Sequence, residues 1–109
     1  MGDLLKNTPV NITNSTTETT ICTGASIAST VLSILICNEE TTDDGTFSIR
    51  VKDNSNSDTA YYIYKDQALP SMATFEHTDK ITLMPSDTLT CTSSSGQVFC
   101  ILVNYLEQT

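Results

Sequence analysis

Residues 28–38 read Ala-Ser-Thr-Val-Leu-Ser-Ile-Leu-Ile-Cys-Asn and carry the strongest strand pattern of the sequence. Their side chains alternate between two apolar sets, with Leu32, Ile34 and Ile36 on one face and Val31, Leu35 and Cys37 on the other. A strand with two apolar faces is typical of one that is covered on both sides. The stretch therefore predicts a buried strand in an all-β fold.

Shorter segments of β character lie on both sides of this stretch, separated by polar turns. They are Thr17–Cys22, Thr46–Lys52, Thr59–Lys65, Ala73–Glu76, Lys80–Met84, Thr88–Thr92 and a C-terminal strand that begins near Val98. About eight short antiparallel strands at this spacing are typical of one β-sandwich or jelly roll. A five-stranded oligonucleotide-binding barrel is the weaker alternative, because it would need a basic face.

The first 16 residues lack helical periodicity and are rich in Asn and Thr, with Pro9 among them. We expect an extended N-terminal arm over residues 1–16 and a sandwich domain over residues 17–109. Leu4, Leu5, Val10 and Ile12 give the arm the apolar side chains with which it could dock on a neighbouring subunit.

The C-terminal segments predict a hairpin with Ser95 and Gly96 at its turn, which would place Cys91 opposite Cys100. One face would then hold Leu89, Cys91, Val98, Cys100 and Leu102, and the other face of the last strand would hold Phe99, Ile101, Val103 and Tyr105. A terminal strand that is apolar on both faces has more to bury than one core can cover. We therefore expect the second set, together with the apolar residues of the arm, to form a subunit interface.

The formal net charge of −8 argues against several partners. A negative surface repels nucleic acid and anionic lipid, and the five basic residues form no run. No apolar stretch approaches the ~20 residues that cross a bilayer, and the N-terminus lacks the pattern of a signal peptide. We expect neither a nucleic acid nor a membrane partner, and synthesis in a host cytoplasm.

No residue pattern indicates a catalytic, cofactor-binding or metal site. The one histidine, His77, lies in a polar segment and is expected to be solvated, and no Gly-x-Ser-x-Gly nucleophile motif occurs. The carboxylates of residues 53–58 could bind calcium, but the segment lacks the glycine and the final glutamate of an EF-hand loop. Tyr62 and Tyr64 share a face by alternation and are expected in the core. We therefore expect no enzyme and no cofactor.

Four cysteines, Cys22, Cys37, Cys91 and Cys100, fit no zinc-binding spacing. In a reducing compartment we expect free, buried thiols. A disulfide between Cys91 and Cys100 stays open as the alternative.

The order of short motifs from residue 19 onward resembles small virion proteins of tailed phages, of the marine and cyanobacterial type. The matching stretches are Thr19-Thr-Ile-Cys-Thr23, Val31-Leu-Ser-Ile-Leu-Ile-Cys-Asn38, Ala60-Tyr-Tyr-Ile-Tyr-Lys-Asp-Gln-Ala-Leu-Pro70, Asp79-Lys-Ile-Thr-Leu83, Ser86-Asp-Thr-Leu89 and Val103-Asn-Tyr-Leu-Glu107. Two turns depart from the family pattern: Pro85-Ser86-Asp87 replaces the usual Ala-Gly-Asp, and the corner after Pro70 lacks its glycine. The resemblance implies a sandwich or jelly-roll subunit of the virion, commonly trimeric.

Residues and resemblance together favour a capsid decoration, or cement, protein on the outside of the shell, whose partners are itself and the major capsid protein or other virion subunits. A collar, neck, tail or fibre-base subunit is the structural alternative. A carbohydrate- or receptor-binding module is the alternative from another class. It would need an exposed aromatic side chain on a loop tip, and the candidate tips at residues 38–45, 53–58 and 93–96 have none.

Overall fold

The computed structural model describes residues 3–12, 18–93 and 98–108. Over this range the chain is built almost wholly of strands, with one short 3-10 turn, η1, at Asn54–Asn56. The strands are β1 (Leu4–Ile12), β2 (Thr19–Thr23), β3 (Ala28–Asn38), β4 (Gly45–Asp53), β5 (Thr59–Leu69), β6 (Thr74–His77), β7 (Ile81–Leu83), β8 (Thr88–Ser93) and β9 (Phe99–Gln108). No helix among these residues has the length and apolar character needed to cross a membrane.

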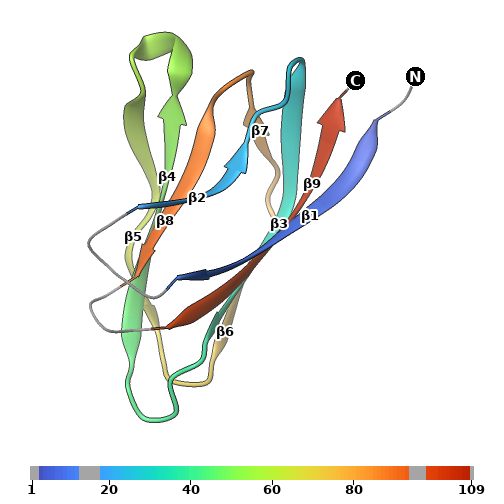
Figure 1. Cartoon of the computed structure of the whole chain (residues 1–109). Coiled ribbons are helices and arrows are strands. Elements are labelled where there is room, and N and C mark those ends of the chain that lie inside the picture. Colours follow the sequence, from blue (N-terminus) through green and yellow to red (C-terminus); the bar gives the residue numbers. More distant parts are fainter. Residues whose placement is uncertain (1–2, 13–17, 94–97, 109) are drawn as a thin grey trace.

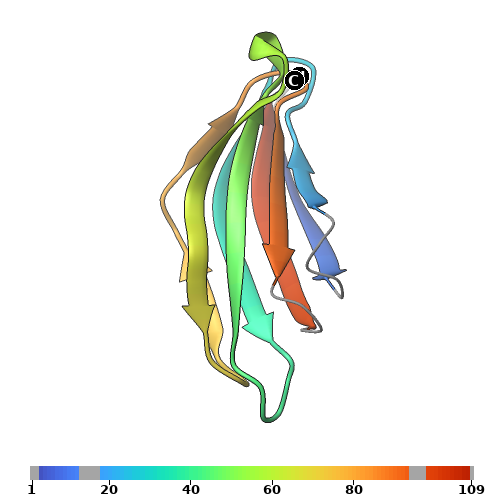
Figure 2. The same cartoon turned by 90° about the vertical axis from the view of Figure 1, so that its left-hand side faces the viewer.

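The strands form two antiparallel sheets that pack face to face, which confirms the predicted all-β sandwich (Figure 1). Sheet A has the order β1-β9-β3-β6, with β7 also paired to β3, and sheet B has the order β2-β8-β4-β5. Figure 2 looks onto the outer face of sheet B, with sheet A behind it. The first two strands pair with the last two, one pair in each sheet, which is a jelly-roll arrangement.

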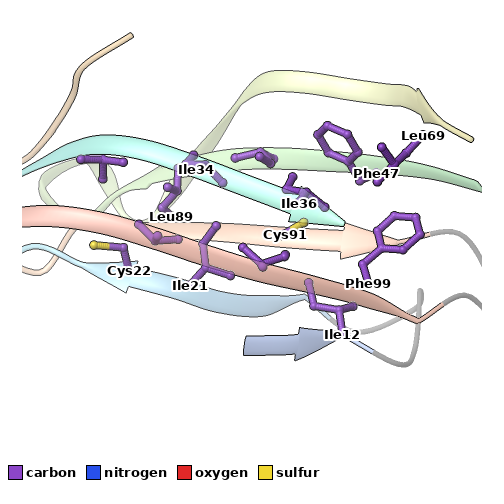
Figure 3. Packing of buried hydrophobic residues seen from close by; sticks show 14 of the residues in the cluster. Ile12, Ile21, Cys22, Ile34, Ile36, Phe47, Leu69, Leu89, Cys91 and Phe99 are labelled. Carbon is purple, nitrogen blue, oxygen red and sulfur yellow. The ribbon is translucent and has the colours of Figure 1, made fainter. Parts of the chain in front are cut away.

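The core fills the space between the two sheets (Figure 3). Its largest fully buried side chains are Phe47, Phe99, Ile12, Ile21, Ile34, Ile36, Ile49, Leu69, Leu83, Leu89, Ile101 and Val31. Each side chain of this size stabilises the fold by roughly 1.5–3 kcal/mol when it leaves water. Both sheets contribute to this set, so neither sheet can form its apolar layer without the other.

The N-terminal segment is extended, but it lies within the sandwich. Leu4–Ile12 forms β1 and pairs along its whole length with β9, from Leu4 opposite Glu107 to Ile12 opposite Phe99. Ile12 is buried in the core of its own chain. Over these residues the expected arm is therefore an edge strand of sheet A. The boundary predicted near residue 16 lies outside the described residues.

The predicted C-terminal hairpin is wrong, because β8 and β9 belong to different sheets. Cys91 lies opposite Thr19 and Ile49 in sheet B, whereas Cys100 lies opposite Asn11 and Cys37 in sheet A. The turn residues Ser95 and Gly96 lie outside the described residues. In a jelly roll the chain crosses between sheets at this point, so apolar alternation in two successive strands does not imply that they pair.

Two irregularities shift the alternation predicted from sequence. A register shift between Val31 and Ser33 puts Val31, Ile34 and Ile36 on the buried face of β3 and leaves Leu35 outside the core. Register shifts on both sides of Ile49, where it pairs with Tyr64, change the alternation of β5 in the same way. A β-bulge adds one residue to one strand and so exchanges the faces of all residues beyond it.

The second irregularity overturns the expectation that Tyr62 and Tyr64 share the core face. Tyr64 packs against the core, whereas Tyr62 is 53% exposed. The register shift between them places the two rings on opposite sides of sheet B. The ring of Tyr62 therefore lies exposed on a strand face, as that of Tyr61 does, although the sequence pattern placed Tyr62 in the core.

Asn38, the last residue of β3, holds together the turns at one end of the sandwich. Its buried side-chain amide donates to the carbonyl oxygens of Asp43, at 3.1 Å, and Leu69, at 3.0 Å. Its side-chain oxygen accepts from the backbone N–H of Glu40 at 2.9 Å. Because a buried amide must satisfy several hydrogen bonds, this residue fixes where the loop after β3 begins.

Candidate interaction surface

The residues predicted to form an interface divide into two groups in the structure. Ile12, Phe99, Ile101 and Val103 are buried between the sheets, and Val10 and Tyr105 are partly buried against the same core. Leu4 and Leu5 at the start of β1 are exposed, Leu5 to 76%. The four buried residues are therefore covered by their own chain and are not available to a partner.

The apolar side chains that the core does not cover lie instead on the outer face of sheet A, on β9 and its neighbours. Since Ile101 and Val103 point into the core, Leu102 and Leu106 point outward, and the same alternation applies to β1 and to the second half of β3. We call the outward residues of these three adjacent strands the apolar face. It comprises Leu5 and Pro9 of β1, Leu35 and Cys37 of β3, and Cys100, Leu102 and Leu106 of β9.

The strand register arranges these residues in rows across sheet A. Pro9, Leu102 and Leu35 form one row, in which each residue lies directly opposite the next. Cys100 and Cys37 form the adjacent row, and Leu5 lies opposite Leu106 farther along. Asn104 and Ser33 lie opposite each other in the row between Leu102 and Leu106. The side-chain amide of Asn104 donates to the hydroxyl of Ser33 at 2.9 Å, so these two polar groups pair with each other.

The apolar face carries no charge along the described strands. The outward positions of β1, β9 and the second half of β3 hold only the apolar residues above with Asn, Ser and Gln, although the whole chain has a formal charge of −8. The nearest carboxylate in the same rows is Glu76, on the neighbouring strand β6. Depletion of charge at a flat apolar surface is the compositional sign of an interface centre.

The outer face of sheet B has the opposite character. The carboxylate of Glu18 forms ion pairs with Arg50 at 2.6 Å and with Lys52 at 2.7 Å. It also accepts a hydrogen bond from the hydroxyl of Thr90 at 2.7 Å. Partial burial alone would raise the pKa of Glu18, but the hydrogen bonds from Lys52, Arg50 and Thr90 lower it to about 2. This network ties the segment before β2 to β4 and β8.

Tyr62 continues this polar surface as an exposed ring between two cations. The guanidinium of Arg50 lies 5.5 Å, and the ammonium of Lys65 5.2 Å, from the centre of the ring. Both distances fall within the range of cation–π attraction. The outer face of sheet B is therefore charged and carries the ring of Tyr62, whereas the outward positions of β1, β9 and the second half of β3 in sheet A are uncharged.

His77 is buried, contrary to the expectation that it is solvated. It is 7% exposed, lies on the inner side of β6, and its Nδ1 is 2.7 Å from the hydroxyl of Tyr64. The ring also contacts Tyr64 edge-on, next to Phe47 and Phe75. Glu76 and Asp79 are exposed, so the three residues do not converge on a site. The role of His77 that the structure supports is to join β6 to β5 across the core.

The clustered carboxylates organise turns. Asp53 accepts from the backbone N–H and the hydroxyl of Ser55, Asp44 from the N–H of Ser71, and Asp87 from the N–H groups of Asn54 and Met84. Across residues 3–12, 18–93 and 98–108, no three His, Cys, Asp or Glu side chains lie close enough together to hold a metal ion.

A pocket of about 280 Å³ opens where β1 and β9 approach β2. Its lining is Thr8, Thr20, Ile21, Cys22, Thr23, Tyr105 and Glu107. Glu107 is already paired with Lys6 at 3.1 Å, and Tyr105, one of the predicted interface residues, forms part of the wall. The pocket holds no pair of groups suited to acid–base chemistry.

The cysteines are free and fall into two environments. Cys22 and Cys91 are buried, as expected, whereas Cys37 is partly exposed and Cys100 is exposed. Because Cys91 faces the core of sheet B and Cys100 the outside of sheet A, the open alternative of a bond between these two is excluded by their placement.

Sequence reasoning missed the apolar face because it assigned the two faces of β9 the wrong way round. The signal was present in the composition of the strand. The outward set includes Asn104 between its leucines, whereas the inward set from Phe99 to Tyr105 is continuously apolar. A polar residue inside an apolar row is the mark of the solvent side.

No protein-family model matches the chain, and no curated protein matches its sequence. Comparison with solved structures does find the fold. A chain of the T13 infectious bursal disease virus particle superposes with a TM-score of 0.60 and 6% identity over 97% of this chain, but the present chain spans only 31% of that viral protein.

Two further matches are chains close to this one in length. One, in the acid-stable capsid of the Helicobacter pylori bacteriophage KHP30, has a TM-score of 0.59, 9% identity and coverage of 97% of this chain and 92% of its own. The other, from Bacillus endospore appendages described as disulfide-linked pili, has a TM-score of 0.58, 12% identity and coverage of 100% and 90%. At these identities the likeness establishes the fold alone, and it places phage capsid proteins among those that share it.

Proposed function

We propose that this protein is a structural subunit of a phage particle, a capsid decoration subunit that assembles on the outer shell through its apolar face. The proposal depends on the way in which apolar side chains line up across the outer face of sheet A. Pro9, Leu102 and Leu35 lie in line on three adjacent strands without a charged neighbour among the outward residues of those strands. An apolar sheet face of this kind gains stability when a second protein surface covers it.

The length of the phage match supports decoration over a shell-forming role. The chain matched within the KHP30 capsid structure is nearly as short as this one, since the alignment covers 97% of the present chain and 92% of the other. A jelly roll of 109 residues has room for one core and little else. A small module of this kind suits a subunit that adds contacts to a shell built by a larger protein.

Self-association is part of the proposal. The exposed Leu5 extends the apolar face onto β1, the edge strand of sheet A, while the exposed Leu4 lies beside it on the other side of the strand. The oligomer we propose is a trimer, as the resemblance to small virion proteins implies. Contacts that exist only in the assembled particle stabilise that particle by mass action.

Incorporation into particles tests the proposal. Leu102→Asp places a charge in the middle of the apolar face, while Thr92→Asp makes the same change at an outward position of sheet B and serves as the control. In particles assembled with each variant, mass spectrometry should find wild type and Thr92→Asp at a copy number comparable to that of the major capsid protein, and Leu102→Asp strongly depleted.

The copy number separates the structural alternatives. A collar, neck, tail or fibre-base subunit would be present in only a small fraction of the copies of the major capsid protein. Absence of the wild-type protein from particles, or undiminished incorporation of Leu102→Asp, would overturn the proposal.

The carbohydrate- or receptor-binding module keeps one supporting observation. Tyr62 is an exposed aromatic ring flanked by Arg50 and Lys65, on a face that stays uncovered if sheet A is the interface. Binding to a panel of immobilised glycans that is lost in Tyr62→Ala and kept in Tyr61→Ala would favour this function.

A further inference from the structure

The four thiols of the chain divide into an inner and an outer pair. Cys22 and Cys91 lie in the core, where burial raises the pKa of Cys22 to about 11 and that of Cys91 to about 12 (Figure 3). Thiols that stay protonated and are buried react slowly with oxidants. Cys37 and Cys100 lie on the outside of sheet A, and Cys100 is exposed.

The outer pair is brought together by the register of the two central strands of sheet A. The strands β3 and β9 run side by side (Figure 1). Cys37 of β3 and Cys100 of β9 are direct cross-strand partners, and their neighbours in the same row are Thr74 and Asn11. Both side chains point outward, because Ile36 and Ile101 beside them point into the core. Directly opposed residues of an antiparallel pair have Cα atoms about 4.5–5.5 Å apart, and disulfides span about 4.4–6.8 Å.

We propose that Cys37 and Cys100 form a redox-reactive dithiol that closes to an intrachain disulfide when it meets a small disulfide such as glutathione disulfide. The thiolate of one cysteine attacks a sulfur of glutathione disulfide and releases one glutathione thiolate. The second cysteine then attacks the mixed disulfide and releases the other. The two protein thiols lose two protons and two electrons, and one glutathione disulfide becomes two glutathiones.

The bond would join strands that lie far apart along the chain. The loop that it closes runs from β3 through β4, β5, β6, β7 and β8 to β9, which is most of the sandwich. A cross-link over a long loop removes conformations from the unfolded chain, so the oxidised protein should melt at a higher temperature. The dithiol also forms one row of the apolar face, so covering that face would shield it from reagents.

The test treats the purified full chain with glutathione disulfide as the oxidant. The protein is then unfolded and alkylated with iodoacetamide, and its intact mass is measured by mass spectrometry. Two of the four cysteines should escape alkylation, and dithiothreitol should restore all four. Chymotrypsin cleaves after Leu35 and Phe99, which separates each outer cysteine from the inner one nearest to it in sequence. The fragments should join Cys37 to Cys100.

Matched variants assign the reaction. Cys37→Ser and Cys100→Ser should each abolish the bond, whereas the double variant Cys22→Ala with Cys91→Ala should form it as wild type does. If that double variant does not fold, the fragment map of the wild-type protein shows which two cysteines are joined.

The oxidation is run on wild type and on Leu102→Asp, in which a second copy should not cover the two thiols. Four free thiols in both proteins, a stable glutathione adduct on Cys100 or a disulfide between two chains would each overturn the inference. The experiment needs no assembly partner, so its failure would leave the proposed function standing. Conversely, a chain that never assembles could still form this bond.

Discussion

Ser86 adopts a backbone conformation that ordinarily belongs to glycine. It follows Pro85 in a turn closed by the N–H of Asp87 and the carbonyl of Met84 at 3.0 Å, and its φ is 67°. Met72, in the turn after Pro70, has a φ of 59°. These are the two places where the sequence departs from the turn glycines of the phage proteins that it resembles, and the conformation explains why glycine suits both positions.

Ser86→Gly should therefore stabilise the protein by about 1 kcal/mol, because glycine has no Cβ to clash in the left-handed region. Urea unfolding followed by circular dichroism measures the change. Ser71→Gly, in a turn position without positive φ, is the control and should lower the stability or leave it unchanged. A Ser86→Gly variant less stable than wild type would contradict the turn geometry.

Gly24 shows the same dependence on a missing side chain for a different reason. A Cβ at this position would lie 2.0 Å from the carbonyl oxygen of Met84, and the Gly24 N–H donates to the carbonyl of Asp87 at 2.8 Å. The close approach of two backbones locks the turn after β2 to the turn before β8. The sequence of the turn after β2 does not contain the information on which segment passes beside Gly24.

Glu18 makes the stability of sheet B depend on pH. Its pKa falls from the ordinary 4.5 to about 2 in the folded chain, so its stabilising effect is complete above about pH 5. The effect is lost as the pH falls from 4.5 towards 2, because over this range the unfolded chain binds a proton at this carboxylate that the folded chain does not.

Glu18→Gln should accordingly lower the free energy of unfolding at pH 7, and its difference from wild type should shrink as the pH approaches 2. Urea titrations at several pH values measure this difference. Glu76→Gln, at an exposed glutamate of sheet A, is the control. A difference between Glu18→Gln and wild type that stays constant from pH 7 to pH 3 would contradict the role of the ion pairs.

At the scale of single strands, composition and alternation were enough to predict most elements. Ala28–Asn38 has the predicted bounds, and the strands from Thr46 to Thr92 agree to within a few residues. The assignment of faces failed wherever a bulge intervened, as at Leu32 and around Ile63, because one extra residue exchanges inside and outside. Bulges depend on the partner strand, which the sequence of one strand does not contain.

The two faces of β9, which the sequence analysis exchanged, can be tested at this scale. Ile101→Ala should cost about 2–5 kcal/mol, because it empties a fully buried site, whereas Leu102→Ala should cost about 1 kcal/mol or less. Chemical denaturation of the two variants compares neighbouring residues on opposite faces of one strand. Equal losses, or a greater loss at Leu102, would mean that the outward face is not the one described.

At the scale of the whole molecule, two unlike surfaces cover one core. The outer side of sheet B holds the ion pairs of Glu18 and the exposed Tyr62, while the outer side of β1, β9 and β3 is apolar and uncharged. The general expectation from sequence, that the chain has more apolar strand surface than its own core covers, agrees with this arrangement. Its location was missed, because the sequence analysis paired β8 with β9, which lie in different sheets, and gave no weight to Asn104 between the outward leucines of β9.

We propose that copies of this chain associate through the apolar face. Sedimentation equilibrium of the full chain over a range of concentrations tests it most directly, with circular dichroism to establish that each variant is folded. We expect an oligomer for wild type and for Thr92→Asp, and a folded monomer for Leu102→Asp. A wild-type chain that remains monomeric at every concentration, or a Leu102→Asp variant that associates as wild type does, would contradict the claim.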